Sequence, residues 1–153
     1  LLRGHELGMS VVELLLLWAA MHLIKVVIAE EAGAQTDRIG RRPLILAGWG
    51  VYAAALVGLA GTHTPIMLWA WSLALGFHFG LTEGAERALV RDLATPAARG
   101  TAFGWFHMIV GMVAIPAGLL LGVLWSEFGV RTAFLVSAAI AALATLGFWR
   151  YVR

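Results

Sequence analysis

The feature that most constrains this sequence is a series of five long apolar runs separated by short polar segments. The runs cover residues 11–32, 44–60, 65–90, 102–125 and 133–149. A transmembrane helix needs roughly 20 mostly apolar residues, and the runs lack the two-residue alternation that indicates a half-buried strand. Because a backbone in lipid must satisfy its own hydrogen bonds, the sequence predicts an all-α, polytopic membrane bundle of five transmembrane helices.

The composition supports the same conclusion. Of 153 residues, 61% are hydrophobic and 13% are charged, and the mean hydropathy is +0.85; a soluble domain has about 25% charged residues. The lipid bilayer is therefore the expected surroundings. The net charge of +2 comes from scattered basic residues and gives no reason to expect a nucleic-acid partner. The absence of cysteine excludes disulfides and thiolate metal sites.

Basic residues gather in the polar segments that lie on one side of the predicted membrane. Those segments, which follow the first, third and fifth runs, contain Arg38, Arg41, Arg42, Arg91, Arg99, Arg150 and Arg153. The opposite side contains only Arg3 and Arg131. By the positive-inside rule, we expect the segment 33–43 to be cytoplasmic and the protein to lie in the plasma or inner membrane.

The most specific motif lies between the first two runs and reads G-x-x-x-D-R-x-G-R-R. Its defined positions are Gly33, Asp37, Arg38, Gly40, Arg41 and Arg42. Gly33 permits close helix approach, Gly40 permits a left-handed turn, and Asp37 can meet a helix N-terminus or an arginine. A generic basic cytoplasmic loop is the alternative reading, because the positive-inside rule alone would produce one.

This pattern resembles the cytoplasmic loop signature of the major facilitator superfamily (MFS) of transporters. The resemblance implies that the segment is a gating loop whose charge pairs between helices hold one conformation. Residues 83–104 also resemble the tenth span and the start of the eleventh in bacterial members. Four apolar runs follow the signature, which suits its second copy, so the resemblance implies a partial MFS fold with spans eight to twelve. The chain begins with Leu1, and we expect it to be cut from a longer one whose N-terminal half is its partner.

Several ionisable residues fall inside the apolar runs, where they are costly and mark functional sites by default. His22 and Lys25 are three residues apart in the first run and are therefore neighbours on one helix face. Together with His78 they are a possible substrate cavity. Two plainer readings stay open. Lys25 can snorkel toward the cytoplasm, and a single histidine in an apolar span is usually satisfied by a backbone carbonyl.

A second charged group lies toward the cytoplasmic end of the third run. Glu83 and Arg87 have the spacing and order that favour an ion pair on a helix, and Glu86 lies beside them. With Asp92 they are predicted to form an intramembrane charge network. Two roles compete for this network: a gate formed with the arginines of the signature, or a carboxylate that couples transport to protons. The closeness of the signature favours the gate.

The fourth run contains a stripe of glycines at Gly104, Gly111, Gly118 and Gly122. Small residues on one face allow transmembrane helices to approach closely, so the stripe predicts a helix-packing surface. His107 borders it.

These features together predict a secondary active transporter that moves a small solute by alternating access, coupled to an ion such as the proton or exporting a drug or metabolite. No catalytic, nucleotide-binding or metal-ligand motif is present, so neither enzymatic activity nor a cofactor is expected. The alternatives are a small membrane scaffold or accessory subunit that does not transport, and a membrane-embedded enzyme.

Overall fold

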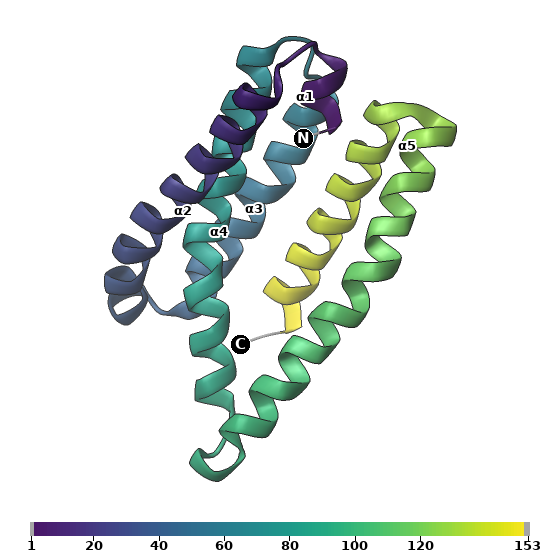
Figure 1. Cartoon of the computed structure of the whole chain (residues 1–153). Coiled ribbons are helices and arrows are strands. Elements are labelled where there is room, and N and C mark those ends of the chain that lie inside the picture. Colours follow the sequence, from purple (N-terminus) through teal and green to yellow (C-terminus); the bar gives the residue numbers. More distant parts are fainter. Residues whose placement is uncertain (1, 152–153) are drawn as a thin grey trace.

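The structure, a computed structural model, describes residues 2–151 apart from the side chain of Asp37. Arg153, which counted toward the predicted cytoplasmic side, lies outside the described residues. The elements in chain order are α1 (Leu2–Glu6), α2 (Val11–Ile39), α3 (Arg41–Ala60), α4 (Pro65–Leu93), the short 3-10 helix η1 (Pro96–Ala98) and α5 (Arg99–Tyr151) (Figure 1). Residues 2–151 contain no strand. The predicted all-α helix bundle is therefore confirmed.

The helix α5 is a hairpin rather than a single rod. Its backbone leaves helical geometry at Gly129, where φ is +82°, a value that glycine adopts easily because it lacks a Cβ. The arms 99–128 and 130–151 run side by side in opposite directions (Figure 1). Helices α2, α3, α4 and the stretch that contains both arms are long and apolar enough to cross a membrane. The chain is therefore a multi-pass membrane protein, and the number of five crossings stays a prediction.

Local signals in the sequence explain where the helices begin. Ser10 caps α2, with its backbone N–H donating to Glu13 Oε2 at 2.7 Å. Thr64 Oγ1 accepts from the backbone N–H of Met67 at 3.3 Å, and Pro65 occupies the first position of α4. Thr64 is thus the N-cap of α4, and Pro65 suits the first helical position because of its fixed φ and missing N–H.

Glycines bring α2 and α4 into backbone contact. A Cβ added at Gly76 would lie 2.5 Å from the carbonyl oxygen of Met21, and one added at Gly80 would lie 2.9 Å from that of Lys25. Any larger side chain would force the helices apart. The second arm of α5 covers α3, where the rings of Trp49 and Phe148 lie 5.1 Å apart. The packed core is thus built from α2, α3, α4 and residues 130–151.

The predicted glycine stripe does not take part in this packing. None of its members has an atom within 4 Å of a Cβ position, namely Gly104, Gly111, Gly118 and Gly122. The stripe lies on the first arm of α5, which packs less than the second arm does. The glycines in close contact are instead Gly4, Gly48, Gly58, Gly76 and Gly80. A packing role for the stripe stays a prediction, because a surface that packs on it would have to come from outside the described residues.

The bundle places the connections between helices at two ends. The α2–α3 and α4–α5 connections lie toward one end, and α1, the α3–α4 turn and the turn within α5 lie toward the other (Figure 1). We call the first the signature end, because it contains Gly40, Arg41 and Arg42. The basic segments between helices therefore share one end, as an antiparallel arrangement of crossings requires.

Candidate functional site

A cavity of about 510 Å³ lies between α2, α3, α4 and both arms of α5. Four charged side chains contribute to its wall: Lys25, Glu83, Glu86 and Arg87. Six rings complete most of the remainder: Trp49, Tyr52, His78, Phe79, Phe106 and His107. Small-molecule sites commonly measure about 300–1,000 Å³ and combine an apolar lining with a few polar groups. The cavity fits that description.

An ion pair between helices forms one side of the cavity. Lys25 Nζ of α2 is paired with Glu83 Oε2 of α4. One turn further along α4, Arg87 Nη2 lies 2.5 Å from Glu83 Oε1. Two cations therefore share a single carboxylate. Lys25 thus points toward α4 and the cavity. If it snorkelled, its ammonium group would be hydrated by water at the membrane surface, whereas here it has a carboxylate partner.

Glu86 has a different environment, although it lies only three residues beyond Glu83. Trp49 Nε1 of α3 donates a hydrogen bond to Glu86 Oε1 at 2.8 Å. The Trp49 ring in turn packs against Phe148 of α5. Within residues 2–151, Glu86 forms no ion pair at salt-bridge distance. Sequence reasoning missed Trp49, because a tryptophan within an apolar run gives no sign that it faces a carboxylate.

His78 is buried, with 7% of its surface exposed, and it still contributes to the cavity wall. Its Nδ1–H donates to the carbonyl oxygen of Gly48 at 2.9 Å, and its ring stacks on Tyr52 with centroids 4.8 Å apart. The histidine is thus satisfied by a backbone carbonyl and also lines the cavity. His22 does not join it there, because its Nδ1–H donates to Trp18 O on the same helix at 2.9 Å.

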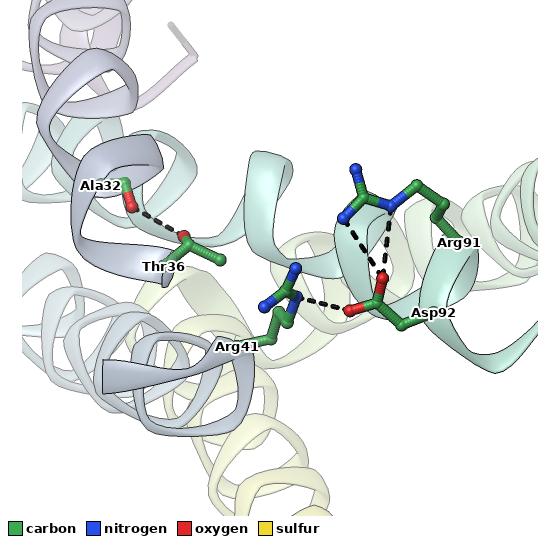
Figure 2. A network of polar contacts seen from close by, with 5 residues as sticks. All are labelled: Ala32, Thr36, Arg41, Arg91 and Asp92. Atoms are coloured by element: carbon green, nitrogen blue, oxygen red, sulfur yellow. Dashed lines mark hydrogen bonds and ion pairs between the residues drawn. The ribbon is translucent and has the colours of Figure 1, made fainter. Parts of the chain in front are cut away.

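The signature end carries a second cluster of charges. Arg41 Nε lies 2.7 Å from Asp92 Oδ2, and Arg91 Nη2 lies 3.2 Å from Asp92 Oδ1 (Figure 2). Nearby, Thr36 Oγ1 donates to Ala32 O at 2.7 Å within the last turns of α2 (Figure 2). Arg42 Nη2 donates to the backbone oxygen of Trp149 at the end of α5. The start of α3 is therefore bonded to the ends of both α4 and α5.

The structure corrects the prediction that the signature is a loop. Gly33, Asp37 and Arg38 belong to α2, which continues to Ile39, and Gly40 alone separates it from α3. Gly40 has φ +87°, the positive value expected of a tight turn. Gly33 has no atom within 4 Å of a Cβ position, so it makes no close helix contact. Arg38 is exposed, and the side chain of Asp37 lies outside the described part of the chain.

The predicted charge network is divided into two clusters. Glu83, Glu86 and Arg87 line the cavity, whereas Asp92 contacts Arg41 at the signature end. Asp92 lies six residues beyond Glu86, which is about 9 Å along the helix axis. That separation explains why one helix contributes charged groups to two places. Within residues 2–151 no group of three or more His, Asp or Glu side chains is arranged to hold a metal ion.

Comparisons with known proteins agree with this architecture. The sequence model of the Major Facilitator Superfamily matches residues 2–153. An uncharacterized MFS-type transporter of Methanocaldococcus jannaschii is 32% identical over 117 residues, which cover 74% of this chain and 28% of the relative. Multidrug resistance protein MdtH of Shigella flexneri is 33% identical over 114 residues, covering 74% of this chain and 27% of the relative.

The MdtH protein of Cronobacter sakazakii is 33% identical over 88 residues, covering 58% of this chain and 22% of the relative. No solved structure matches the chain. The chain spans about a quarter of the length of these relatives. The relatives are transporters or resistance proteins by name, so the matches point away from an enzyme. With a family match that extends over residues 2–153 and relatives above 30% identity, this chain belongs to the major facilitator superfamily.

Proposed function

We propose that the chain forms the C-terminal part of a secondary active transporter, which moves a small solute across a cell membrane by alternating access. The observation that carries the proposal is the cavity of about 510 Å³ among membrane-crossing helices, with charged side chains in its wall. Ionisable groups at such depth are costly unless they serve a pathway. Membership of a family of transporters supports the same function.

In this proposal the cavity is part of the solute site. Lys25, Glu83, Glu86 and His78 supply polar contacts, and the rings supply apolar ones. The N-terminal half of the same transporter would supply the facing wall. Two of the relatives are named multidrug resistance proteins, and we extend export of a drug or metabolite to this chain as part of the proposal.

The contacts at the signature end are proposed to act as a gate on the cytoplasmic side. Arg41 joins α3 to α4 through Asp92, and Arg42 joins α3 to α5 through Trp149. An opening of this end would have to break these contacts. Coupling is assigned to protons in the proposal, with Glu86 as the carboxylate that exchanges one, because it forms no ion pair at salt-bridge distance within residues 2–151.

The test is gradient-driven flux by the complete product of the gene that encodes this chain. The purified protein is reconstituted into liposomes, a proton gradient is imposed, and movement of a panel of drugs and metabolites is followed. We expect at least one solute to move only while the gradient lasts. A folded protein that moves none of them would favour the scaffold or accessory role. Turnover of a compound in detergent, with no second compartment, would indicate an enzyme.

A further inference from the structure

The charged groups of the cavity differ in how many of their ion-pair and hydrogen-bond positions are occupied. Lys25 and Arg87 are both paired with Glu83. Glu86 accepts one hydrogen bond, from Trp49 to Oε1, and has no ion pair at salt-bridge distance in the part of the chain that the structure describes. Its second oxygen, Oε2, is left as an acceptor. A carboxylate without a cationic partner is expensive in a membrane span, so a ligand cation would remove a standing cost.

His78 provides a second acceptor, and its neighbour fixes which nitrogen carries the proton. The partner of Nδ1 is the carbonyl oxygen of Gly48, which can only accept a hydrogen bond. Nδ1 must therefore carry the hydrogen, and in the neutral ring Nε2 has a free lone pair. Among the described residues nothing donates to Nε2, and His78 is part of the cavity wall. Because His78 lines the cavity, Nε2 is the ring atom that can accept a hydrogen bond from a ligand N–H or O–H in this inference.

The two acceptors lie far apart along one face of α4. His78 and Glu86 are eight residues apart, which corresponds to about 12 Å along the axis and a rotation of about 80°. Tyr52 stacks on His78, and Trp49 is bonded to Glu86. Both rings come from α3, and Phe106 of α5 lines the same cavity. The site is therefore an elongated slot with aromatic walls and an acceptor toward each end.

The remaining charges restrict the ligand further. Lys25 and Arg87 are both paired with Glu83, and with Glu86 included the four charged side chains of the wall sum to zero. An anionic ligand would have to displace Glu83 from two partners at once. A second positive charge on the ligand would find no carboxylate of the wall left without an ion pair once Glu86 is occupied. One ammonium group and a neutral donor at the far end satisfy both conditions.

We propose that the cavity binds an elongated primary amine whose far end carries a hydroxyl or another neutral hydrogen-bond donor. The ammonium group bonds Glu86 Oε2, the far donor bonds His78 Nε2, and the body of the ligand lies along Trp49, Tyr52 and Phe106. This inference rests on the proposed function, because it takes the cavity as the solute site of a transporter.

The experiment measures calorimetric binding of unbranched amino alcohols to the purified complete gene product in detergent. Chains from aminoethanol to aminododecanol are compared with alkylamines of equal length. We expect an affinity optimum at an intermediate length, near aminooctanol, because the ligand has to span the rise of about 12 Å between His78 and Glu86 along α4. Aminooctanol should bind about tenfold more tightly than octylamine, because one hydrogen bond is added in a buried site.

Substitutions assign each contact. Glu86→Gln should weaken both ligand series about tenfold or more, since a charge-assisted bond is lost. His78→Phe should lower the affinity for aminooctanol to that for octylamine. His78→Gln keeps an N–H for Gly48 and a carbonyl acceptor, so it should retain the preference for the alcohol even if the phenylalanine variant fails to fold. Glu31→Gln and His63→Phe, exposed positions away from the cavity, are the matched controls and should bind as the unsubstituted protein does.

Three results would overturn the proposal. Affinity that rises steadily with chain length, without an optimum, would indicate simple hydrophobic partition. Equal binding of octylamine and aminooctanol would remove His78 from the site. Tighter binding of octanoate would place the ligand charge on Lys25 and Arg87 instead. Flux assays separate this question from transport. Transport of other solutes without amine binding refutes only the ligand class, and the expected binding pattern without any flux refutes only the transporter.

Discussion

Arg41 Nε lies 2.7 Å from Asp92 Oδ2, so the first residue of α3 is ion-paired with the penultimate residue of α4. The two side chains are 24% and 40% exposed. Exposed ion pairs contribute only about 0–1 kcal/mol to stability. A contact of that size has little influence on whether the chain folds, but it is large enough to bias two conformations of similar energy.

We therefore expect Asp92→Asn to change conformation more than stability. Removal of about 1 kcal/mol from one state changes the ratio of two states about fivefold, while the thermal midpoint should barely move. The readout is labelling of a single cysteine introduced at Ala98 in η1. The sequence contains no native cysteine, so no background labelling comes from this chain. Arg99→Gln, at the same end, is the control and should leave the labelling rate unchanged.

Asp37→Asn is expected to impair switching in the same assay, because the signature predicts that this carboxylate pairs with an arginine. Glu31→Gln, six residues earlier on α2, serves as the comparison. Undiminished transport and unchanged labelling in the Asp37 variant would remove Asp37 from the gate.

The pairing of Lys25 and Glu83 predicts an unequal cost for removing either side. Lys25→Met leaves Glu83 paired with Arg87, whereas Glu83→Gln leaves two cations side by side without their carboxylate. Loss of a partner from a charged hydrogen bond costs about 1–3 kcal/mol, with the lower part of that range expected for side chains that are about one-third exposed. Thermal unfolding in detergent should show the larger loss for Glu83→Gln. Equal losses would mean that the pairing of Glu83 with Arg87 adds nothing to stability.

Close packing of α2 on α4 makes Gly76 intolerant of any side chain. A Cβ there would approach the Met21 carbonyl to 2.5 Å, so Gly76→Ala should destabilise by about 1–3 kcal/mol, the usual cost of overpacking. Gly111→Ala has open space around its Cβ and should be neutral or slightly stabilising, because alanine favours helix. Chemical or thermal unfolding compares the two. A costly Gly111→Ala in the complete gene product would show that another surface covers the stripe.

A pH effect is expected at the end of the bundle opposite the signature. The hydrogen bond from Arg3 holds the pKa of Glu6 below its usual value of 4.5, assisted by one from Trp125 Nε1. Because the folded state lowers this pKa, the stabilisation is present above about pH 4.5 and is lost as pH falls through the lowered value. The Glu6 side chain is open to solvent, so the effect should stay below about 1 kcal/mol. Glu6→Gln should reduce the change in thermal midpoint between neutral and acidic pH. Glu127→Gln, the control, should leave that change as it is in the unsubstituted protein.

The sequence was sufficient for the helices and for the family, because both depend on local signals. Apolar runs of membrane-spanning length, the cap at Thr64 and the turn at Gly40 are all readable in a single sequence. The pairing of Glu83 with Arg87 was also predictable, since it joins neighbours on one helix. The extension of α2 through Gly33 was not predictable, because charged residues end the apolar run although the helix itself continues into polar surroundings.

Contacts between helices were beyond the reach of the sequence. The bond from Trp49 to Glu86 joins residues 37 positions apart, and the ion pair of Lys25 with Glu83 joins residues on different helices. Which glycines pack also depends on which faces meet. Gly76 and Gly80 lie in contact with α2, whereas the more regular series in the first arm of α5 meets open space. Spacing identifies a smooth face but cannot say what covers it.

The backbone contact of α2 with α4 has a mechanical consequence. Gly80 meets the backbone of Lys25, and Lys25 is paired with Glu83 less than one turn further along α4. Close backbone packing and an ion pair therefore hold the two helices together at the same height along their axes. Neither helix can slide or rotate against the other without disrupting both contacts. They would have to move as one rigid unit when the transporter changes the side to which it is open. The cavity would then change shape mainly by movement of the first arm of α5, which is packed more loosely, with Gly129 as the hinge.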